Sequence, residues 1–232
     1  MNNLALVRHG ETEWNARGVW TGNVDVGLTA QGRQEAHRAA ELLRDITLDA
    51  AHASMLRRSQ ETLAIIKYAL DRDDLPVYLD SALNERDYGI LTGKNKWEVK
   101  EKYGEEQFLK WRRGWDYPIP GGETLRDVYR RVVPYYQQYV LPDILKAKNI
   151  LISAHGNSLR ALIKYLENVS DQDIIDLELS TGEVCVYEIN TRGKAVNKDM
   201  RKTLPPVSAQ EERVRKAPIT SPSSTYRQFD IR

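Results

Sequence analysis

Two His-Gly dipeptides, far apart in the sequence, each follow an apolar run. The run LALV (4–7) leads into Arg8-His9-Gly10, and the run ILISA (150–154) leads into His155-Gly156. A neutral imidazole nitrogen can attack phosphorus, and nearby cations favour that neutral form. Cations also stabilise the charge on a phosphoryl group in transfer. The pattern therefore predicts a phosphoryl acceptor histidine beside an arginine.

A metal site is the competing use of these two histidines. Their surroundings are rich in arginine, which repels a divalent cation, and the sequence has no ligand-spaced cluster such as HExxH. We therefore expect no metal. His37, on a helical pattern, and His52, near the end of an apolar run, are interpreted as structural histidines.

The elements that must position His9 and His155 alternate between strands and helices. Apolar runs at 4–7, 50–53, 76–79, 149–154 and 183–189 predict strands, and helical patterns at 29–46, 54–70, 123–145 and 158–166 lie between them. This alternation predicts an α/β fold with three layers, a mostly parallel central sheet flanked by helices.

Local signals mark the ends of the predicted helices. Thr29 and Ser54 are the expected N-caps of two of them. Pro134 is expected to kink the long helical pattern, and Pro142 to interrupt its end.

Binding sites of parallel α/β sheets form outside the carboxyl ends of the strands. If the two His-Gly strands are neighbours, His9 and His155 face one crevice, where Gly10 and Gly156 allow sharp turns and close approach to a ligand. The helix after Gly156 offers its N-terminal amides to an anion. Arg57 and Arg58 lie in the first turn of another predicted helix, which favours a bound anion there; the alternative is that they point into solvent.

Phosphoryl transfer also needs an acid for the leaving oxygen. Glu85, in the turn-rich LNERDYGILTG, is the candidate, and a surface ion pair with Arg86 is its alternative role.

The overall charge limits the choice of partner. The net charge is +1, from 34 basic and 33 acidic residues, which argues against a nucleic-acid binder. Cys185, the single cysteine, excludes an internal disulfide and is expected to be reduced and buried. Neither a signal peptide nor a membrane-spanning run is recognisable, so we expect a cytoplasmic protein without membrane contact.

The C-terminal stretch differs in composition from the rest. Residues 1–197 are expected to form a single catalytic domain. Residues 198–232 are rich in Pro, Ser and charge, which predicts a mobile tail that closes over the site, docked through Tyr226 and Phe229.

Five segments together resemble the cofactor-dependent phosphoglycerate mutases of the histidine phosphatase superfamily. They are LVRHGETEWN, SMLRRSQET, LNERDYGILTGKNK, WRRG and AHGNSLRAL, in order between about Leu4 and Tyr187. The resemblance implies that His9 is the phosphorylated nucleophile and Glu85 the proton donor and acceptor. It implies a phosphoryl pocket and contacts to the rest of the substrate, formed by Arg8, Arg58, His155, Asn15, Gly156, Thr21, Gly22, Tyr88, Lys96, Arg112, Arg113 and Asn157.

The implied reaction interconverts 3-phosphoglycerate and 2-phosphoglycerate, with 2,3-bisphosphoglycerate as primer and no metal. Many members of the family carry a longer insertion between WRRG and GETL, where this chain has only WDYPIPGG. That insertion contributes surface, so a homo-oligomer is possible but its size is left open.

Two other functions remain in competition with a mutase. A phosphatase for a small phosphomonoester needs one anion site and water, whereas a mutase needs a second anion site and must exclude water. Lys96, Arg112 and Arg113 are the candidate second site, unless they form the solvated face of a charged helix, and they favour the mutase. A non-catalytic phospho-ligand binding module ranks third, because His9 and Glu85 are both present.

Overall fold

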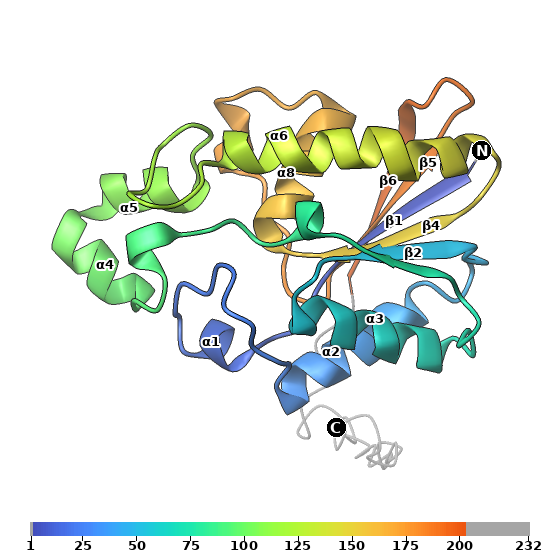
Figure 1. Cartoon of the computed structure of the whole chain (residues 1–232), viewed down its shortest axis with the longest axis horizontal. Coiled ribbons are helices and arrows are strands. Elements are labelled where there is room, and N and C mark those ends of the chain that lie inside the picture. Colours follow the sequence, from blue (N-terminus) through green and yellow to red (C-terminus); the bar gives the residue numbers. More distant parts are fainter. Residues whose placement is uncertain (1, 203–232) are drawn as a thin grey trace, which may run out of the picture.

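The computed structural model describes residues 2–202, which contain a six-stranded sheet in the order β3-β2-β4-β1-β5-β6 (Figure 1). β3, β2, β4 and β1 are mutually parallel, and β5 and β6 form antiparallel pairs beside β1. The predicted mostly parallel sheet is confirmed. The strands are β1 (Asn2–Arg8), β2 (Ala50–Ala53), β3 (Val77–Leu79), β4 (Ile150–Ala154), β5 (Val184–Ile189) and β6 (Ala195–Arg201).

The central strands are apolar on both faces, because helices cover both. Successive side chains of a strand point to opposite faces. Leu4 and Leu6 of β1 accordingly belong to one core cluster, and Ala5 and Val7 to the other, all without solvent exposure. This two-sided burial explains the unbroken apolar runs that precede the His-Gly dipeptides.

Four helices form the outer layers of the fold (Figure 1). α2 (Ala30–Glu41) and α3 (Arg57–Ala69) cover one face, and α6 (Leu125–Tyr135) and α8 (Gly156–Glu167) cover the other. Thr29 caps α2 as predicted, with its side chain accepting from the Gly32 amide. The predicted cap of α3 is wrong: its N-cap is Leu56, and the Ser54 hydroxyl accepts from the amide of Leu56 itself.

The long helical pattern is continuous but irregular. α6 contains Pro134, a π-helical turn spans Tyr136–Val140, and α7 (Leu141–Leu145) begins with Pro142 in its first turn. A proline has no N–H to donate to the preceding turn, so the regular hydrogen-bond ladder is interrupted at both predicted places.

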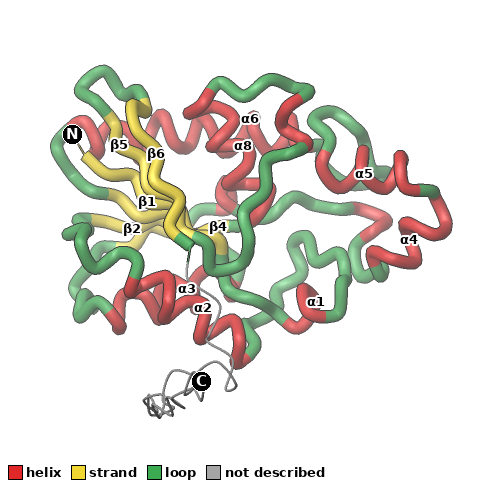
Figure 2. The backbone as a smooth tube through the Cα atoms, turned by 180° about the vertical axis from the view of Figure 1, so that it is seen from behind, coloured by secondary structure: helices red, strands yellow, loops and turns green. Residues whose placement is uncertain are grey.

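A smaller group of helices lies beyond the carboxyl ends of the parallel strands. Figure 2 shows α1 (Glu13–Ala16), α4 (Lys96–Tyr103) and α5 (Glu105–Arg113) on the side of the molecule away from the N-terminus. α4 and α5 share a small core, to which Val99, Phe108 and the neighbouring Trp20 belong. Short 3₁₀ turns complete the described chain: Ser81–Leu83, Gly89–Leu91 and Asp173–Ile175.

The domain boundary expected at residue 198 lies inside a strand. β6 pairs with β5 as far as Arg201. The sequence shows little sign of β6, because its side chains are mostly exposed at the sheet edge and form no apolar run. The predicted lid and its anchors Tyr226 and Phe229 lie outside the described residues.

Two further sequence expectations concern the rest of the chain. Cys185 is buried in β5, as expected. Between residues 2 and 202 the helices are all too short or too polar to cross a membrane. A cytoplasmic location and a homo-oligomer stay predictions.

Candidate active site

The two His-Gly turns lie side by side. β1 and β4 pair in parallel with Arg8 opposite Ala154, and the His9 amide donates to the Ala154 carbonyl at 3.0 Å. The two imidazole rings are 5.0 Å apart between centroids and inclined by 58°. The predicted proximity of the two histidines is confirmed, but only His9 lines the cavity described below; His155 is fully buried beside it and lines neither of the two cavities of the site.

His9 has the protonation state that a nucleophile needs. Its Nδ1 lies 2.7 Å from the Gly10 carbonyl oxygen, which only accepts, so Nδ1 carries the hydrogen and Nε2 keeps its lone pair. Burial and the charges of Arg58 and Arg8 together hold the pKa of His9 well below its ordinary value. The ring is therefore neutral at pH 7.

His155 has the same dipeptide sequence but different partners. It has no solvent exposure, and its Nε2 lies 2.7 Å from the Ser54 hydroxyl oxygen. Burial, followed by the charge of Arg58, lowers the pKa of His155 well below its ordinary value. The sequence pattern assigns Ser54 to a helix cap and so misses its contact with His155; nothing in the local sequence indicates that contact.

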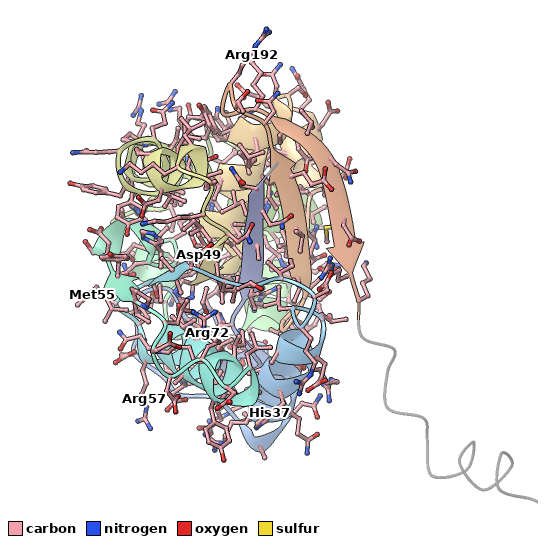
Figure 3. The ribbon with its side chains drawn as sticks, turned by 90° about the vertical axis from the view of Figure 1, so that its right-hand side faces the viewer. His37, Asp49, Met55, Arg57, Arg72 and Arg192 are labelled. Carbon is pink, nitrogen blue, oxygen red and sulfur yellow. The ribbon has the colours of Figure 1, made fainter. Side chains whose placement is uncertain are left out.

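The two adjacent arginines at the start of α3 differ. Arg58 is 1% exposed and donates to the carbonyls of Val24 and Gly22 at 2.9 and 2.8 Å. Burial lowers the pKa of Arg58 to about 10, so it stays charged at neutral pH. Arg57 is exposed and ion-paired with Glu61 (Figure 3). For Arg57, the alternative that the side chain points into solvent is therefore correct.

His37 and His52, the two histidines interpreted as structural, do not line either cavity of the site. His37 lies on the outer surface of α2, where Figure 3 labels it. His52 is buried, with Nδ1 2.7 Å from the Tyr135 hydroxyl, and burial lowers its pKa to about 4.

Glu85 is 8% exposed, and its Oε1 accepts from three groups of the protein. These are the Arg86 amide at 2.7 Å, the Asn157 amide at 3.2 Å and the Asn157 Nδ2 at 3.1 Å. The Arg86 guanidinium is buried and donates to the Trp111 carbonyl. The alternative role of Glu85, a surface ion pair with Arg86, is therefore wrong. With Oε1 held, Oε2 is the oxygen that remains for a ligand; it lies near Gly156 in the first turn of α8.

A cavity open to solvent, with about 350 Å³ of empty space, lies at His9. We call it the histidine lobe. The Asn15 side chain lines it, with Oδ1 engaged by Thr12, which leaves the Nδ2 group as a donor. The predicted residues among its lining are Arg8, His9, Asn15, Thr21, Gly22, Arg58, Glu85, Tyr88 and Lys96.

A second cavity of about 540 Å³, open to solvent, adjoins the first. We call it the arginine lobe. Both lobes are lined by Arg8, Trp20, Glu85, Tyr88 and Lys96, so they form one continuous site. The predicted residues confined to the arginine lobe are Arg112, Arg113, Gly156 and Asn157.

The cations of the arginine lobe crowd one another. Lys96 is half-buried, and its pKa falls to about 8 because of burial and the charges of Arg112 and Arg8. Burial, followed by Arg113, lowers the pKa of Arg112. Like charges held together in a cavity are a cost that an anionic ligand removes. The alternative of a fully solvated helix face is therefore wrong for these cations.

Arg160 is a site residue that sequence reasoning missed. It is 5% exposed and lines the arginine lobe. Its guanidinium donates to Asn157 Oδ1 at 2.9 Å and to the carbonyls of Arg113 and Ile174, both at 2.6 Å. It thus fixes the Asn157 amide so that Nδ2 points to Glu85. A buried-face arginine one helical turn after His155-Gly156 is the signal that could have found it.

Several buried polar atoms around the cavities have no partner among the described residues. They include Arg8 Nε, Trp20 Nε1 and Thr21 Oγ1. Since buried donors are normally satisfied, these groups fit a ligand rich in oxygen acceptors, such as a phosphorylated acid. They belong to residues that line the histidine lobe.

The glycines of the two His-Gly dipeptides have different structural roles. A Cβ on Gly10 would lie 2.1 Å from the Gly32 carbonyl oxygen, so Gly10 serves close packing against α2 rather than ligand approach. A Cβ on Gly156 would lie 3.7 Å from the Arg8 guanidinium and Glu85 Oε2, so Gly156 does face the site.

Within residues 2–202, no three His, Cys, Asp or Glu side chains gather to hold a metal ion. Independence from metal stays a prediction.

An arginine-enclosed histidine at the end of the first strand, opposite a second histidine and a carboxylate, defines a class of phosphoryl-transfer enzymes. Residues 4–199 match the family model of the histidine phosphatase superfamily, branch 1. The chain belongs to this family.

Curated relatives give a narrower comparison. A protein of Parvibaculum lavamentivorans named 2,3-bisphosphoglycerate-dependent phosphoglycerate mutase is 45% identical over 201 residues, which cover 86% of this chain and 96% of the relative. A protein of the same name from Afipia carboxidovorans is 48% identical over 188 residues, 80% of this chain and 91% of the relative.

Solved structures share the fold. The α-ribazole phosphatase of Shigella flexneri superposes with a TM-score of 0.70 at 28% identity, over 86% of this chain and 94% of that one. The YhfR protein of Bacillus stearothermophilus superposes with a TM-score of 0.74 at 27% identity, over 84% and 95%.

Proposed function

We propose that this protein is a phosphoglycerate mutase that interconverts 3-phosphoglycerate and 2-phosphoglycerate through a phosphohistidine at His9. The observation that carries the proposal is the pair of adjoining cationic lobes, with Glu85 lining both. A mutase must hold a phosphoryl group in transfer and, at the same time, the carboxylate and second oxygen of a three-carbon acid. The mutase name of relatives at 45 and 48% identity supports the same reaction.

The proposed chemistry follows from the protonation states. Neutral His9 attacks the phosphorus through Nε2 while its Nδ1–H stays on the Gly10 carbonyl. Arg8 and Arg58 stabilise the charge of the phosphoryl oxygens. Glu85 protonates the oxygen that leaves and later takes the proton from the oxygen that attacks the phosphohistidine. His155, fixed through Ser54, lies beside His9, and its Nδ1, which has no partner among the described residues, would donate to the phosphoryl group.

The primer fits the same residues. 2,3-bisphosphoglycerate, when bound, supplies the phosphoryl group that first loads the enzyme. Arg8 and Arg58 would hold the phosphate that lies at His9. Lys96, Arg112 and Arg113 would hold its other anionic groups, which offsets the mutual repulsion of these cations.

A phosphatase for a small phosphomonoester is the second candidate. The histidine lobe alone would suffice for it, and a solved relative at 28% identity is named α-ribazole phosphatase. The arginine lobe has no role in simple hydrolysis, so it favours the mutase.

Product analysis separates the two functions. The protein is incubated with 3-phosphoglycerate, with and without 2,3-bisphosphoglycerate, in the presence of a chelator, and the products are followed by phosphorus NMR. A mutase gives 2-phosphoglycerate, faster with the primer and unaffected by the chelator. Inorganic phosphate as the main product would establish the phosphatase, and loss of activity with chelator would establish a metal requirement.

A further inference from the structure

The arginine lobe contains a carboxylate of the protein itself. Glu178 lines the cavity, its Oε2 accepts a hydrogen bond from Arg113, and its Oε1 lies 3.8 Å from Arg112. Partial burial alone would raise the pKa of Glu178, but the hydrogen bond to Arg113 and the charges of both arginines lower it overall. Glu178 is therefore an anion at neutral pH. It contacts Arg112 and Arg113, the two cations that the proposed function assigns to the substrate.

Arg112 and Arg113 also have contacts other than Glu178. The Arg113 carbonyl accepts from Arg160 at 2.6 Å, and Arg113 Nη1 donates to the Ile175 carbonyl at 3.4 Å. The Arg112 guanidinium lies over the Phe108 ring, 5.9 Å from its centre. Glu178, in contrast, has a side chain that is 51% exposed, so it can leave the arginines without disturbing a core.

We propose that Glu178 is a resident competitor that occupies Arg112 and Arg113 until the carboxylate of a phosphorylated three-carbon acid displaces it. The proposal rests on the proposed function, because it assigns the arginine pair to the ligand carboxylate. Ion pairing with Glu178 offsets one of the two positive charges between turnovers, weakens ligand binding and favours product release. Glu178 thus sets the affinity of the site without touching the reacting atoms.

The test compares Glu178→Gln with Glu106→Gln. Both variants remove one negative charge, but Glu106 is exposed on α5 and paired with Lys110, outside the lining of the cavity. Binding is measured by calorimetry with 4-phosphonobutyrate, which carries a carboxylate and a phosphonate that cannot be transferred. Butylphosphonate, which lacks the carboxylate, is the matched ligand.

We expect Glu178→Gln to bind 4-phosphonobutyrate about two- to fivefold more tightly than wild type, the scale of a partly exposed ion pair. The affinity for butylphosphonate should rise less, and Glu106→Gln should change the affinity for neither ligand. In the mutase assay the same variant should lower KM without raising kcat. A purely supporting role of Glu178 would instead weaken binding.

Three results would overturn the proposal: unchanged or weaker binding of 4-phosphonobutyrate by Glu178→Gln, an equal gain for butylphosphonate, or an equal gain in Glu106→Gln. Because the phosphonates are not substrates, the binding result does not depend on whether wild type acts as a mutase. If wild type released only phosphate from 3-phosphoglycerate, the proposed function would fail while the binding comparison stayed interpretable.

Discussion

The histidine lobe and the arginine lobe adjoin, yet they are built differently. The histidine lobe is set by the sheet: His9 follows β1, and Arg58, which is 1% exposed, is held by two backbone carbonyls. The arginine lobe shares α8 with the sheet layers, but its cations Lys96, Arg112 and Arg113 come from α4 and α5, outside the sheet. The side chains of Arg112 and Arg113 are 35 and 22% exposed. Arg112 and Arg113 face the half-exposed carboxylate of Glu178.

This difference separates chemistry from selection. Bond making at phosphorus needs fixed donors in a low-dielectric place, which the buried histidine lobe offers. Recognition of the remaining substrate groups tolerates exposed cations on peripheral helices. Changes in the histidine lobe should therefore remove turnover, and changes in the arginine lobe should alter affinity and the fate of the phosphoryl group.

The largest effect is expected for His9→Ala. Mutase activity should fall by about 10⁴-fold or more, the scale for loss of a covalent nucleophile. The fold should survive, because the side chain ends a strand and faces a cavity. Activity is measured by 2-phosphoglycerate formation and the fold by thermal melting, with His37→Ala on the surface of α2 as the matched control. Turnover by His9→Ala within tenfold of wild type would exclude His9 as nucleophile.

Glu85→Gln should lower kcat by about 10² to 10⁴-fold, the usual contribution of a general acid. Glutamine can still accept from the Asn157 amide, so the geometry is kept while the transferable proton is lost. Phosphorylation of His9 by p-nitrophenyl phosphate should be nearly preserved, because its leaving group needs no proton. An equal loss with both substrates would mean that Glu85 acts through the structure of the site.

In the arginine lobe, Lys96→Ala and Arg113→Ala should each weaken 3-phosphoglycerate binding about ten- to a hundredfold, the worth of a charge-assisted contact. The ratio of 2-phosphoglycerate to free phosphate should fall, since weakly held 3-phosphoglycerate leaves the phosphohistidine open to attack by water. Lys110→Ala removes a cation of α5 that is paired with Glu106 and should change little. An unchanged ratio in the two lobe variants would favour the phosphatase.

The smallest expected effect is the pH dependence of the kinetic constants. Lys96 should affect KM on the alkaline side, and His9 should affect kcat on the acidic side. The pKa of Lys96 is lowered to about 8, so its charge is lost as pH rises through that value and KM should increase. The pKa of His9 lies well below its ordinary value, so kcat should persist on acidification past the usual range of histidine. Lys96→Arg should abolish the alkaline rise in KM. A rise that persists in this variant would assign it to another group.

Sequence patterns predicted the histidine lobe better than the arginine lobe, for a physical reason. The apolar runs before His9 and His155 report burial on both faces, whereas the pairing of their two strands was only a condition of the sequence argument, which the structure meets. Arg160 lies within a helical pattern and Ser54 beside the start of one, and neither pattern specifies a distant partner. Their contacts with Asn157 and His155 arise only from tertiary packing. β6 was missed because an exposed edge strand needs no apolar run.

The central claim is that the phosphoryl group on His9 goes to a phosphoglycerate and not to water. The direct measurement loads the enzyme with labelled phosphate from 2,3-bisphosphoglycerate, isolates the acid-labile phosphoenzyme and mixes it with 3-phosphoglycerate or with buffer alone. We predict that label leaves the enzyme much faster with 3-phosphoglycerate and is recovered in phosphoglycerates. Release of label as inorganic phosphate, at the same rate with and without 3-phosphoglycerate, would contradict the mutase.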